Sequence, residues 1–266
     1  MCDSVRNSLF GKPQVVGSNP TPATINPKLL VNKGKKKPLT CMPYYVRMKS
    51  ITRTSRNTLN RLPARANYDR EVIHSIIDDA IICHVGFVVD DSPFVIPTAI
   101  MRQGENIYLH GNSQSRMLQH LGSGHEACIS VTHVDGMVLA RSGFHSSINY
   151  RSVSLFGRGN LVKGTRKNQL LNDFVESLIP GRAADVRPMT SNEINITSVI
   201  EFPIKEASAK VSVGPPSDDK KDYDLPIWAG VIPLEINRGD PIPDPQMKFP
   251  IDTPAYVLNY MSTRNQ

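Results

Sequence analysis

The first regular pattern of apolar and polar positions in the chain begins after Asp69. Apolar residues at 72, 73, 76 and 77 recur at helical spacing, and Asp69 is a suitable N-cap. A helix is therefore expected that ends near Ala80. The β-branched run 81–89 then predicts a strand, and the turn residues 90–93 lead to a returning strand over 94–101.

Short strands and few helices continue the pattern. Strands are predicted over 107–110, 127–134, 137–142, 153–157, 197–202, 207–213 and 227–234. Asp135-Gly136 is the strongest hairpin signal in the chain and should connect two of them. A short helix should begin at Ser113 or Ser115, and a helical stripe over 166–178 precedes Pro180-Gly181.

Short strands joined by tight turns indicate a mainly β class with flanking helices, a small barrel or sandwich. We expect one domain over 53–235. Residues 1–50 carry scattered prolines and no apolar period, which predicts a disordered, basic, Pro-rich tail. Residues 236–266 are expected to form an extended Pro-rich segment.

The formal net charge of +7 is concentrated in that tail. Residues 1–56 hold 11 Lys or Arg side chains and a single acid, Asp3, so the rest of the chain is weakly acidic. The run Lys33–Lys37 fits a nuclear-localisation or phosphate-binding patch. A solvated disordered arm is the favoured interpretation, because short lysine runs are common. No nucleic-acid partner is expected for the folded domain.

The N-terminal segment also raises a question about where translation begins. Gly17-Ser18-Asn19-Pro20 resembles one reading frame of the T-arm of a transfer-RNA gene. The hypothesis follows that the physiological start is Met42 or Met48, and N-terminal sequencing of the native protein tests it.

Cysteine and histidine usage points away from a metal centre. The 4 cysteines show no paired spacing, which indicates a reduced, cytoplasmic protein without structural disulfides. Cys83-His84 and Cys128 with His133 lack recognised zinc spacings, so no metal is predicted. No apolar stretch approaches the length of a spanning helix, and no secretory signal follows the start, so no membrane association is expected.

Hydrolytic and nucleotide-loop motifs are absent, and Gly157-Arg158-Gly159 does not continue into a dinucleotide fingerprint. Phosphate-capable groups instead gather where a strand passes into a helix, over His110–Arg116. A second polar cluster spans Ala140–Ser142 and Asn149–Ser152. The first cluster suits a phosphate monoester, although Ser115 also has a simple role as an N-cap and Arg116 as a surface residue.

Several sequence blocks occur together in one order. They are Asn60–Ala66, Cys83–Phe87, Tyr108–Gly111 with Ser115–Met117, Val131–Gly136, Leu139–Ser142, Phe144–Val153, Pro180–Arg182, Glu206–Lys210 and Trp228–Val231. Together they resemble the flavin-nucleotide-binding branch of the pyridoxamine 5′-phosphate oxidase-like superfamily, which includes nitroimidazole reductases. The resemblance covers about residues 53–235.

The resemblance implies an FMN-binding split β-barrel and a homodimer with FMN at the subunit interface. By the same resemblance, Ser113, Ser115 and Arg116 hold the FMN phosphate, and Pro97 and Thr98 line the isoalloxazine. Further implied cofactor-binding residues are Asn149, Tyr150, Arg151 and Ser152 at the ribityl chain or phosphate, and Lys210 and Trp228 near the flavin or the dimer seam.

His110 is the catalytic residue that the resemblance implies. It occupies the strand-end position where nitroimidazole reductases place an active-site histidine, and an imidazole there can donate a proton to a reduced substrate. The alternative is a histidine that only hydrogen-bonds a neighbouring loop. The C-terminal part shows no Arg-x-His ending of the pyridoxamine-phosphate oxidases, so vitamin B6 oxidation is not expected.

The expected function is an FMN-dependent oxidoreductase that passes electrons from NADH or NADPH to a small-molecule acceptor, nitro compounds being one class. The alternative is a non-catalytic FMN-binding or storage protein. A third hypothesis, nucleic-acid binding, rests on the charge of the tail alone.

Overall fold

The computed structural model describes residues 49–262. The predicted tail, its lysine run and the proposed alternative starts lie outside the described residues, apart from positions 49 and 50. The chain divides into the units Met1–Val46 and Arg47–Gln266, and the fold below is that of the second unit.

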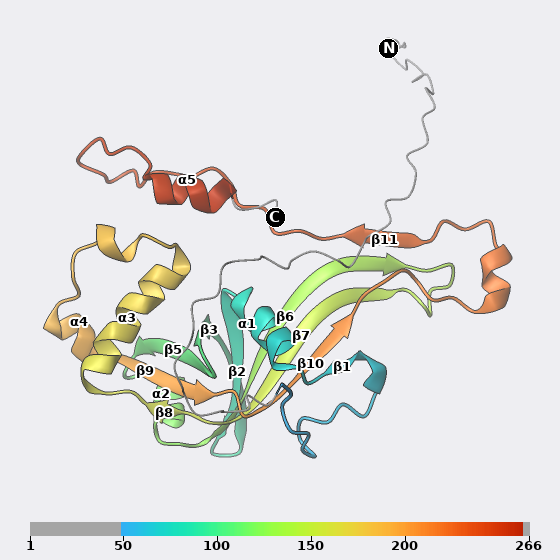
Figure 1. The fold of residues 1–266 in the computed structure, drawn as a ribbon, viewed down its shortest axis with the longest axis horizontal. Helices are drawn as coiled ribbons and strands as arrows, with labels where there is room; N and C mark the ends of the chain where they lie inside the picture. The colour runs from blue at the N-terminus through green and yellow to red at the C-terminus, as the bar shows by residue number, and fades with distance from the viewer. Residues whose placement is uncertain (1–48, 263–266) are drawn as a thin grey trace, which may run out of the picture. The chain divides into compact units, whose positions relative to one another are not determined.

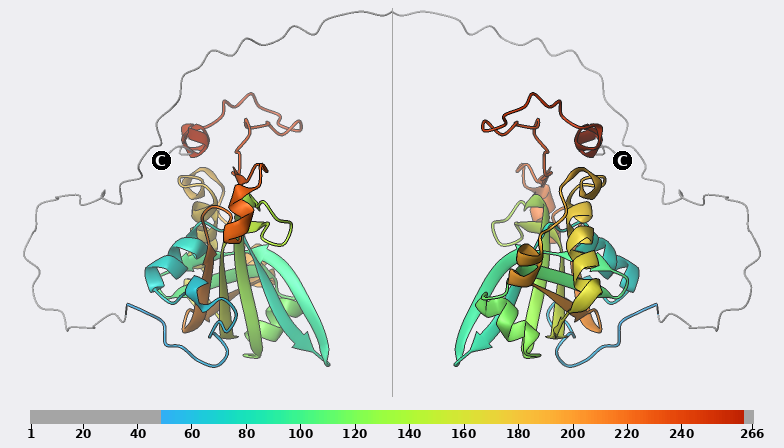
Figure 2. Two further views of the ribbon diagram at one scale, coloured as in Figure 1. Left: turned by 90° about the vertical axis from the view of Figure 1, so that its right-hand side faces the viewer. Right: turned by 90° about the vertical axis from the view of Figure 1, so that its left-hand side faces the viewer.

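The larger of two antiparallel sheets has seven strands (Figure 1). Its order is β1-β10-β7-β6-β2-β3, and β11 pairs with the far part of β6. The strands are β1 Ala66–Asn67, β2 Ile82–Val89, β3 Ser92–Ala99, β6 Glu126–Leu139, β7 Ser147–Arg158, β10 Glu206–Ser212 and β11 Gly230–Pro233. Both views of Figure 2 show the β2–β3 hairpin at the margin of the sheet. Pro93 and Pro97 remove hydrogen-bond donors from this edge, which discourages unwanted strand pairing.

The smaller sheet has four strands in the order β4-β5-β9-β8. They are β4 Met101–Gln103, β5 Asn106–Asn112, β8 Asn160–Leu161 and β9 Thr197–Pro203. The main core joins the two sheets to the helices α1 (Arg70–Asp78) and α2 (Arg116–Gly122). On the opposite face of the small sheet, Leu170, Leu171 and Phe174 of α3 (Gly164–Leu178) form a second core.

The predicted fold class, mainly β with flanking helices, is confirmed. The two sheets do not close into one continuous barrel, which is consistent with a split barrel. The helix predicted after Asp69 is also confirmed, because the Asp69 carboxylate accepts a hydrogen bond from the Glu71 backbone N–H at 2.9 Å.

The hairpin predicted at Asp135-Gly136 is wrong. β6 continues through this dipeptide with only a register shift, and the chain turns back at 140–146 instead. Glycine is required there for packing: a Cβ on Gly136 would lie 3.0 Å from the carbonyl oxygen of Ile232, so its absence lets β11 approach. The strand expected over 94–101 is divided, because β3 ends at Ala99 and Met101 begins β4 of the other sheet.

Short helices complete the chain: η1 (Pro63–Arg65), η2 (Ala183–Asp185), α4 (Ser191–Ile196), η3 (Lys220–Asp224) and α5 (Ala255–Ser262). The helix α5 corrects the expectation of a wholly extended C-terminal segment, since residues 255–262 contain no proline to interrupt it. None of the helices within 49–262 has the length and apolar character needed to cross a membrane.

Candidate functional site

Ser113, Ser115 and Arg116 form a corner between the end of β5 and the start of α2, here called the α2 corner. The Asn112 side chain accepts a hydrogen bond from the Gln114 N–H at 2.8 Å, and the Asn112 carbonyl accepts one from the Ser115 N–H at 2.9 Å. Ser115 is the N-cap of α2, as predicted, but its hydroxyl caps no backbone N–H. Two serines therefore adjoin Arg116 along the chain, in a turn held by its own hydrogen bonds.

Arg116 has no carboxylate partner among residues 49–262. Its guanidinium instead lies over the ring of Phe94, 4.6 Å from the centroid. Phe94 belongs to β3, which also carries the exposed Pro97 and the half-buried Thr98. The structure thus connects the predicted phosphate-binding corner to the strand predicted to line the isoalloxazine.

His110 lies on β5 just before the α2 corner, but its ring turns toward α3. The imidazole packs on Phe174 with 4.2 Å between ring centroids, and its buried Nδ1 has no hydrogen-bond partner in the described part of the chain. Burial lowers the pKa of His110, so the ring is held neutral near pH 7. It borders a cavity of about 490 Å³ with Leu171, Val175 and Met189.

The predicted cluster Asn149–Ser152 lies on β7, and Ser152 pairs with Lys210 of β10. β6 and β2 separate these strands from β3, so one protomer does not unite this cluster with the α2 corner along the sheet. Arg151 is already engaged: its guanidinium contacts Asp135 at 3.0 Å and Asp79 at 2.7 Å. Hydrogen bonds to these carboxylates raise the pKa of Arg151.

Trp228 precedes β11 and is 67 % exposed. Its indole covers Gly230, where an added Cβ would lie 2.9 Å from the ring. Trp228 therefore lies with β11 at the far end of β6, apart from the α2 corner.

Asn149, Tyr150 and Lys210 line a second cavity of about 510 Å³, here called the basic pocket. Its other polar and aromatic lining residues include Arg61, Arg65, Phe144, His145, Ser147, Ser212 and Ser217. Arg61 and Arg65 belong to the block Asn60–Ala66 that carried the family resemblance, but no role was predicted for them. The structure brings Arg61 and Arg65 to the same cavity as Lys210, because β1 pairs with β10 so that Ala66 lies opposite Lys210.

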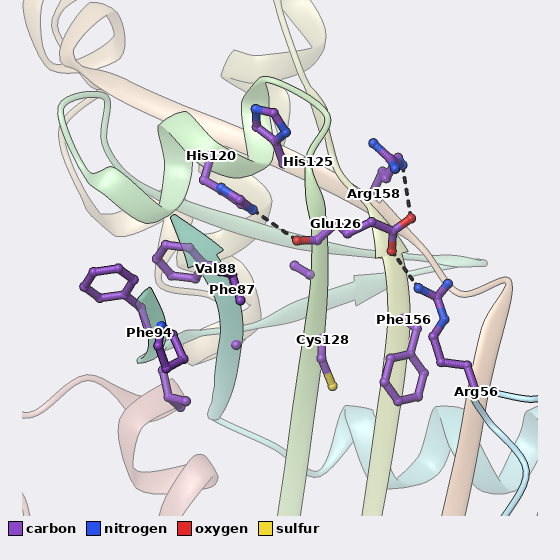
Figure 3. A pocket seen from close by; sticks show the side chains of 14 residues that line it. Arg56, Phe87, Val88, Phe94, His120, His125, Glu126, Cys128, Phe156 and Arg158 are labelled. Carbon is purple, nitrogen blue, oxygen red and sulfur yellow. Dashed lines mark hydrogen bonds and ion pairs between the residues drawn. The ribbon is translucent and has the colours of Figure 1, made fainter. Parts of the chain in front are cut away.

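A third cavity, of about 640 Å³, was not predicted at all (Figure 3). Phe87, Phe94 and Phe156 give it apolar walls, and the rings of His120 and His125 lie at one side, 4.9 Å apart. No local pattern indicates it, because most of its residues come from β2, β3, α2, β6 and β7, each with an ordinary strand or helix pattern.

The rim of this cavity is a charged network. Glu126 bridges Arg56 at 2.7 Å and Arg158 at 3.1 Å, and its backbone carbonyl lies 3.0 Å from His120 Nε2 (Figure 3). The hydrogen bond from Arg56 is the main reason that the pKa of Glu126 is lowered. Cys128 lies half-buried in the floor, where burial raises the pKa of its thiol.

The other described cysteine, Cys83, is a core residue, and burial raises its pKa to about 12. Within residues 49–262, no three or more His, Cys, Asp or Glu side chains gather in an arrangement that could hold a metal ion. Of the remaining histidines, His133 forms a hydrogen bond with the carbonyl of Ile76 at 2.9 Å.

Residues 69–211 match the family model of pyridoxamine 5′-phosphate oxidase. The flavocytochrome Anf3 from Azotobacter vinelandii is 39 % identical, with 77 % of this chain and 96 % of that chain covered and a TM-score of 0.74. The FAD and heme binding protein from Mycobacterium smegmatis is 33 % identical, with 73 % and 96 % covered and a TM-score of 0.71. No curated protein matches the chain.

Proposed function

Because this chain belongs to the pyridoxamine 5′-phosphate oxidase-like family, we propose that it is a flavin-dependent oxidoreductase. The names of two solved structures that resemble it over nearly their whole length, a flavocytochrome and an FAD and heme binding protein, support a flavin as the cofactor. The α2 corner is the observation that carries the proposal, since it offers hydroxyls and an unpaired guanidinium to a phosphate.

The FMN unit, present in FMN and in FAD, is proposed to bind with its phosphate at Ser113, Ser115 and Arg116. Its ring system then lies along β3, beside Pro97 and Thr98, which have the exposure required for contact. The chain's role is to bind and orient the flavin, and the flavin supplies the redox chemistry when it is bound. NADH or NADPH is the proposed electron donor, and a small molecule such as a nitro compound the acceptor.

A homodimer is proposed to complete this site. Val134, Met137 and Ile148 are exposed along the far half of β6 and β7 and line an apolar groove of about 720 Å³. A second copy of the chain that covers this groove removes the apolar surface from water. It also offers a route by which Lys210 and Trp228 of one protomer reach the flavin of the other.

His110 is proposed to bind the electron acceptor by a hydrogen bond. The ring is neutral near pH 7 because burial lowers its pKa, so it can donate an N–H hydrogen bond into the cavity as an uncharged imidazole. The cavity beside α3 is then the acceptor site, with Phe174 fixing the orientation of the imidazole.

Flavin binding and turnover test the proposal separately. Purified full-length protein should show flavin absorbance or acquire it when FMN or FAD is added. Bleaching by NADH or NADPH, followed by reoxidation with an added acceptor, is expected of the enzyme. Binding without bleaching would favour the storage alternative, and failure to bind either flavin would refute both.

A haem beside the flavin is the second candidate, and the aromatic cavity of Figure 3 favours it. The residues fit a haem in part. The walls are apolar, and the imidazoles of His120 and His125 are potential ligands of a haem iron. His120 Nε2 is held by a backbone carbonyl, which leaves the exposed His125 as the proposed ligand. A haem spectrum that is lost in His125→Ala but kept in Cys128→Ser would support it, and identical haem spectra in wild type and His125→Ala would overturn it.

A further inference from the structure

The basic pocket gathers three cations, while Asp218 and Asp219 beside it contact Arg141 and His145. Arg61, Arg65 and Lys210 line it, whereas none of its lining residues is Asp or Glu. None of these three cations has an ion-pair partner within residues 49–262. Like charges repel one another in a concave site, so the arrangement is favourable only when an anion with several charges enters.

The backbone around the two arginines is held in an unusual conformation. Leu62 adopts the left-handed region, with φ 57° and ψ 58°, immediately before η1. This conformation is rare for a bulky residue and is concentrated at functional sites. β1 then pairs with β10 so that Ala66 lies opposite Lys210, which brings Arg65 next to the lysine.

The two segments that carry Phe144 and Ser217 into the pocket wall are held by hydrogen bonds of their own. Asp218 accepts hydrogen bonds from the backbone N–H groups of Arg141 at 3.0 Å and Ser142 at 3.3 Å. Asn149 Nδ2 donates to the Gly214 carbonyl at 3.0 Å, and Gly214 has a φ of +111° that suits glycine. A rigid wall reduces the entropy lost on binding.

The pocket also offers a platform for a flat ring. Phe144 is 90 % exposed and Tyr150 is half-buried, and Ser147, Ser212 and Ser217 also line the pocket. Aromatic side chains beside a cationic groove are the usual means of binding a base and its phosphates. The volume of about 510 Å³ is in the range of small-ligand sites.

We infer that the basic pocket binds the adenosine diphosphate part of a dinucleotide, with the diphosphate at Arg61, Arg65 and Lys210 and the adenine at Phe144. The diphosphate follows from the pocket itself. The choice of adenine rests on the proposed function, because both proposed electron donors, NADH and NADPH, contain this half. The pocket is distinct from the α2 corner, which takes the flavin's phosphate, so the basic pocket holds the electron donor.

Titration of the full-length protein with ADP, after removal of any co-purified small molecule, tests the inference. ADP should bind, and adenosine should bind at least about 100-fold more weakly because it lacks the diphosphate. The double variant Arg61→Gln/Arg65→Gln should weaken ADP binding by about 10- to 100-fold. The matched control Lys163→Gln/Lys205→Gln removes the same charge at exposed sites outside the pocket and should leave ADP binding unchanged.

Phe144→Ala tests the contribution of the adenine base to binding separately from that of the phosphates. It should weaken ADP binding by about tenfold and leave the binding of inorganic diphosphate unchanged. Because this side chain is 90 % exposed, its removal leaves the core intact, and equal thermal unfolding of variant and wild type verifies this.

Two further ligands identify the source of the ADP unit. NADPH should lose affinity in the arginine double variant, whereas FMN, whose phosphate is assigned to the α2 corner, should bind as it does to the wild type. No ADP binding by the wild type, or equal ADP binding by wild type and double variant, would overturn the inference. A parallel loss of FMN affinity would overturn it too, because the pocket would then hold the flavin's own phosphate. Arg116→Ala tests the flavin site independently.

Discussion

Two sets of arginines in this molecule have opposite surroundings. Arg151 and Arg56 each contact carboxylates, Asp135 and Asp79 in one case and Glu126 and Glu206 in the other. Arg116 at the α2 corner and Arg61 in the basic pocket have no such partner in the described residues. A paired guanidinium stabilises the fold, whereas an unpaired one beside hydroxyls is available to a ligand. Residue type therefore says less about function than the partners of the side chain.

The largest expected effect is at the α2 corner. Arg116→Ala should raise the flavin dissociation constant by an amount equivalent to about 1.5–3 kcal/mol, because a charge-assisted contact to phosphate is lost. Fluorescence titration measures it. Arg102→Ala is the control, since Arg102 is paired with Asp78 at 2.5 Å and should leave flavin affinity unchanged. Equal flavin affinities in the wild type and Arg116→Ala would refute the phosphate assignment.

Replacing Arg151 should lower the stability of the fold and leave flavin affinity unchanged, the reverse of what is expected for Arg116. Arg151→Met leaves Asp135 and Asp79 facing each other without their cation, and we expect a loss of about 1 kcal/mol in the free energy of unfolding. Urea denaturation measures this loss, and flavin affinity should not change. A loss of flavin affinity with stability intact would restore Arg151 to the cofactor-binding role implied by the family resemblance.

His110 is a buried titratable group whose Nδ1 has no hydrogen-bond partner in the described part of the chain. Burial lowers its pKa in the folded protein, so the unfolded state binds the proton more readily. Its contribution to stability is complete above the ordinary histidine pKa and is lost as the pH falls toward the depressed folded pKa. His110→Phe should flatten the decline of the urea midpoint between neutral and mildly acidic pH. An unchanged pH profile would mean that the ring is accessible to water in the folded state.

The smallest effect is expected at the exposed rim of the aromatic cavity. Arg158→Ala removes a contact of 3.1 Å to Glu126, but the side chain is 61 % exposed and the Arg56 contact remains. We expect a change of no more than about 0.5 kcal/mol in the free energy of unfolding, measured by urea denaturation. A larger loss would show that this network stabilises the fold as Arg151 does.

Local patterns were sufficient where neighbouring residues decide the structure. The Asp69 cap, the stripe in α3 and the turn before α2 were all predicted, because helical spacing and capping chemistry are contained in a few consecutive residues. Asp135-Gly136 misled for the same reason. Its local preference for a turn is outweighed by continuous pairing of β6 with β7 and by the close approach of β11, both contributed by distant segments.

The sequence by itself determined the fold class, the family and the α2 corner, whose members are adjacent along the chain. Only the tertiary structure decided which cations are free. It placed Asp79 and Asp135 on Arg151, and it brought Arg61 and Arg65 into one pocket with Lys210, with no carboxylate partner among residues 49–262. The availability of a charged side chain depends on distances between strands far apart in sequence, and no local pattern encodes those distances.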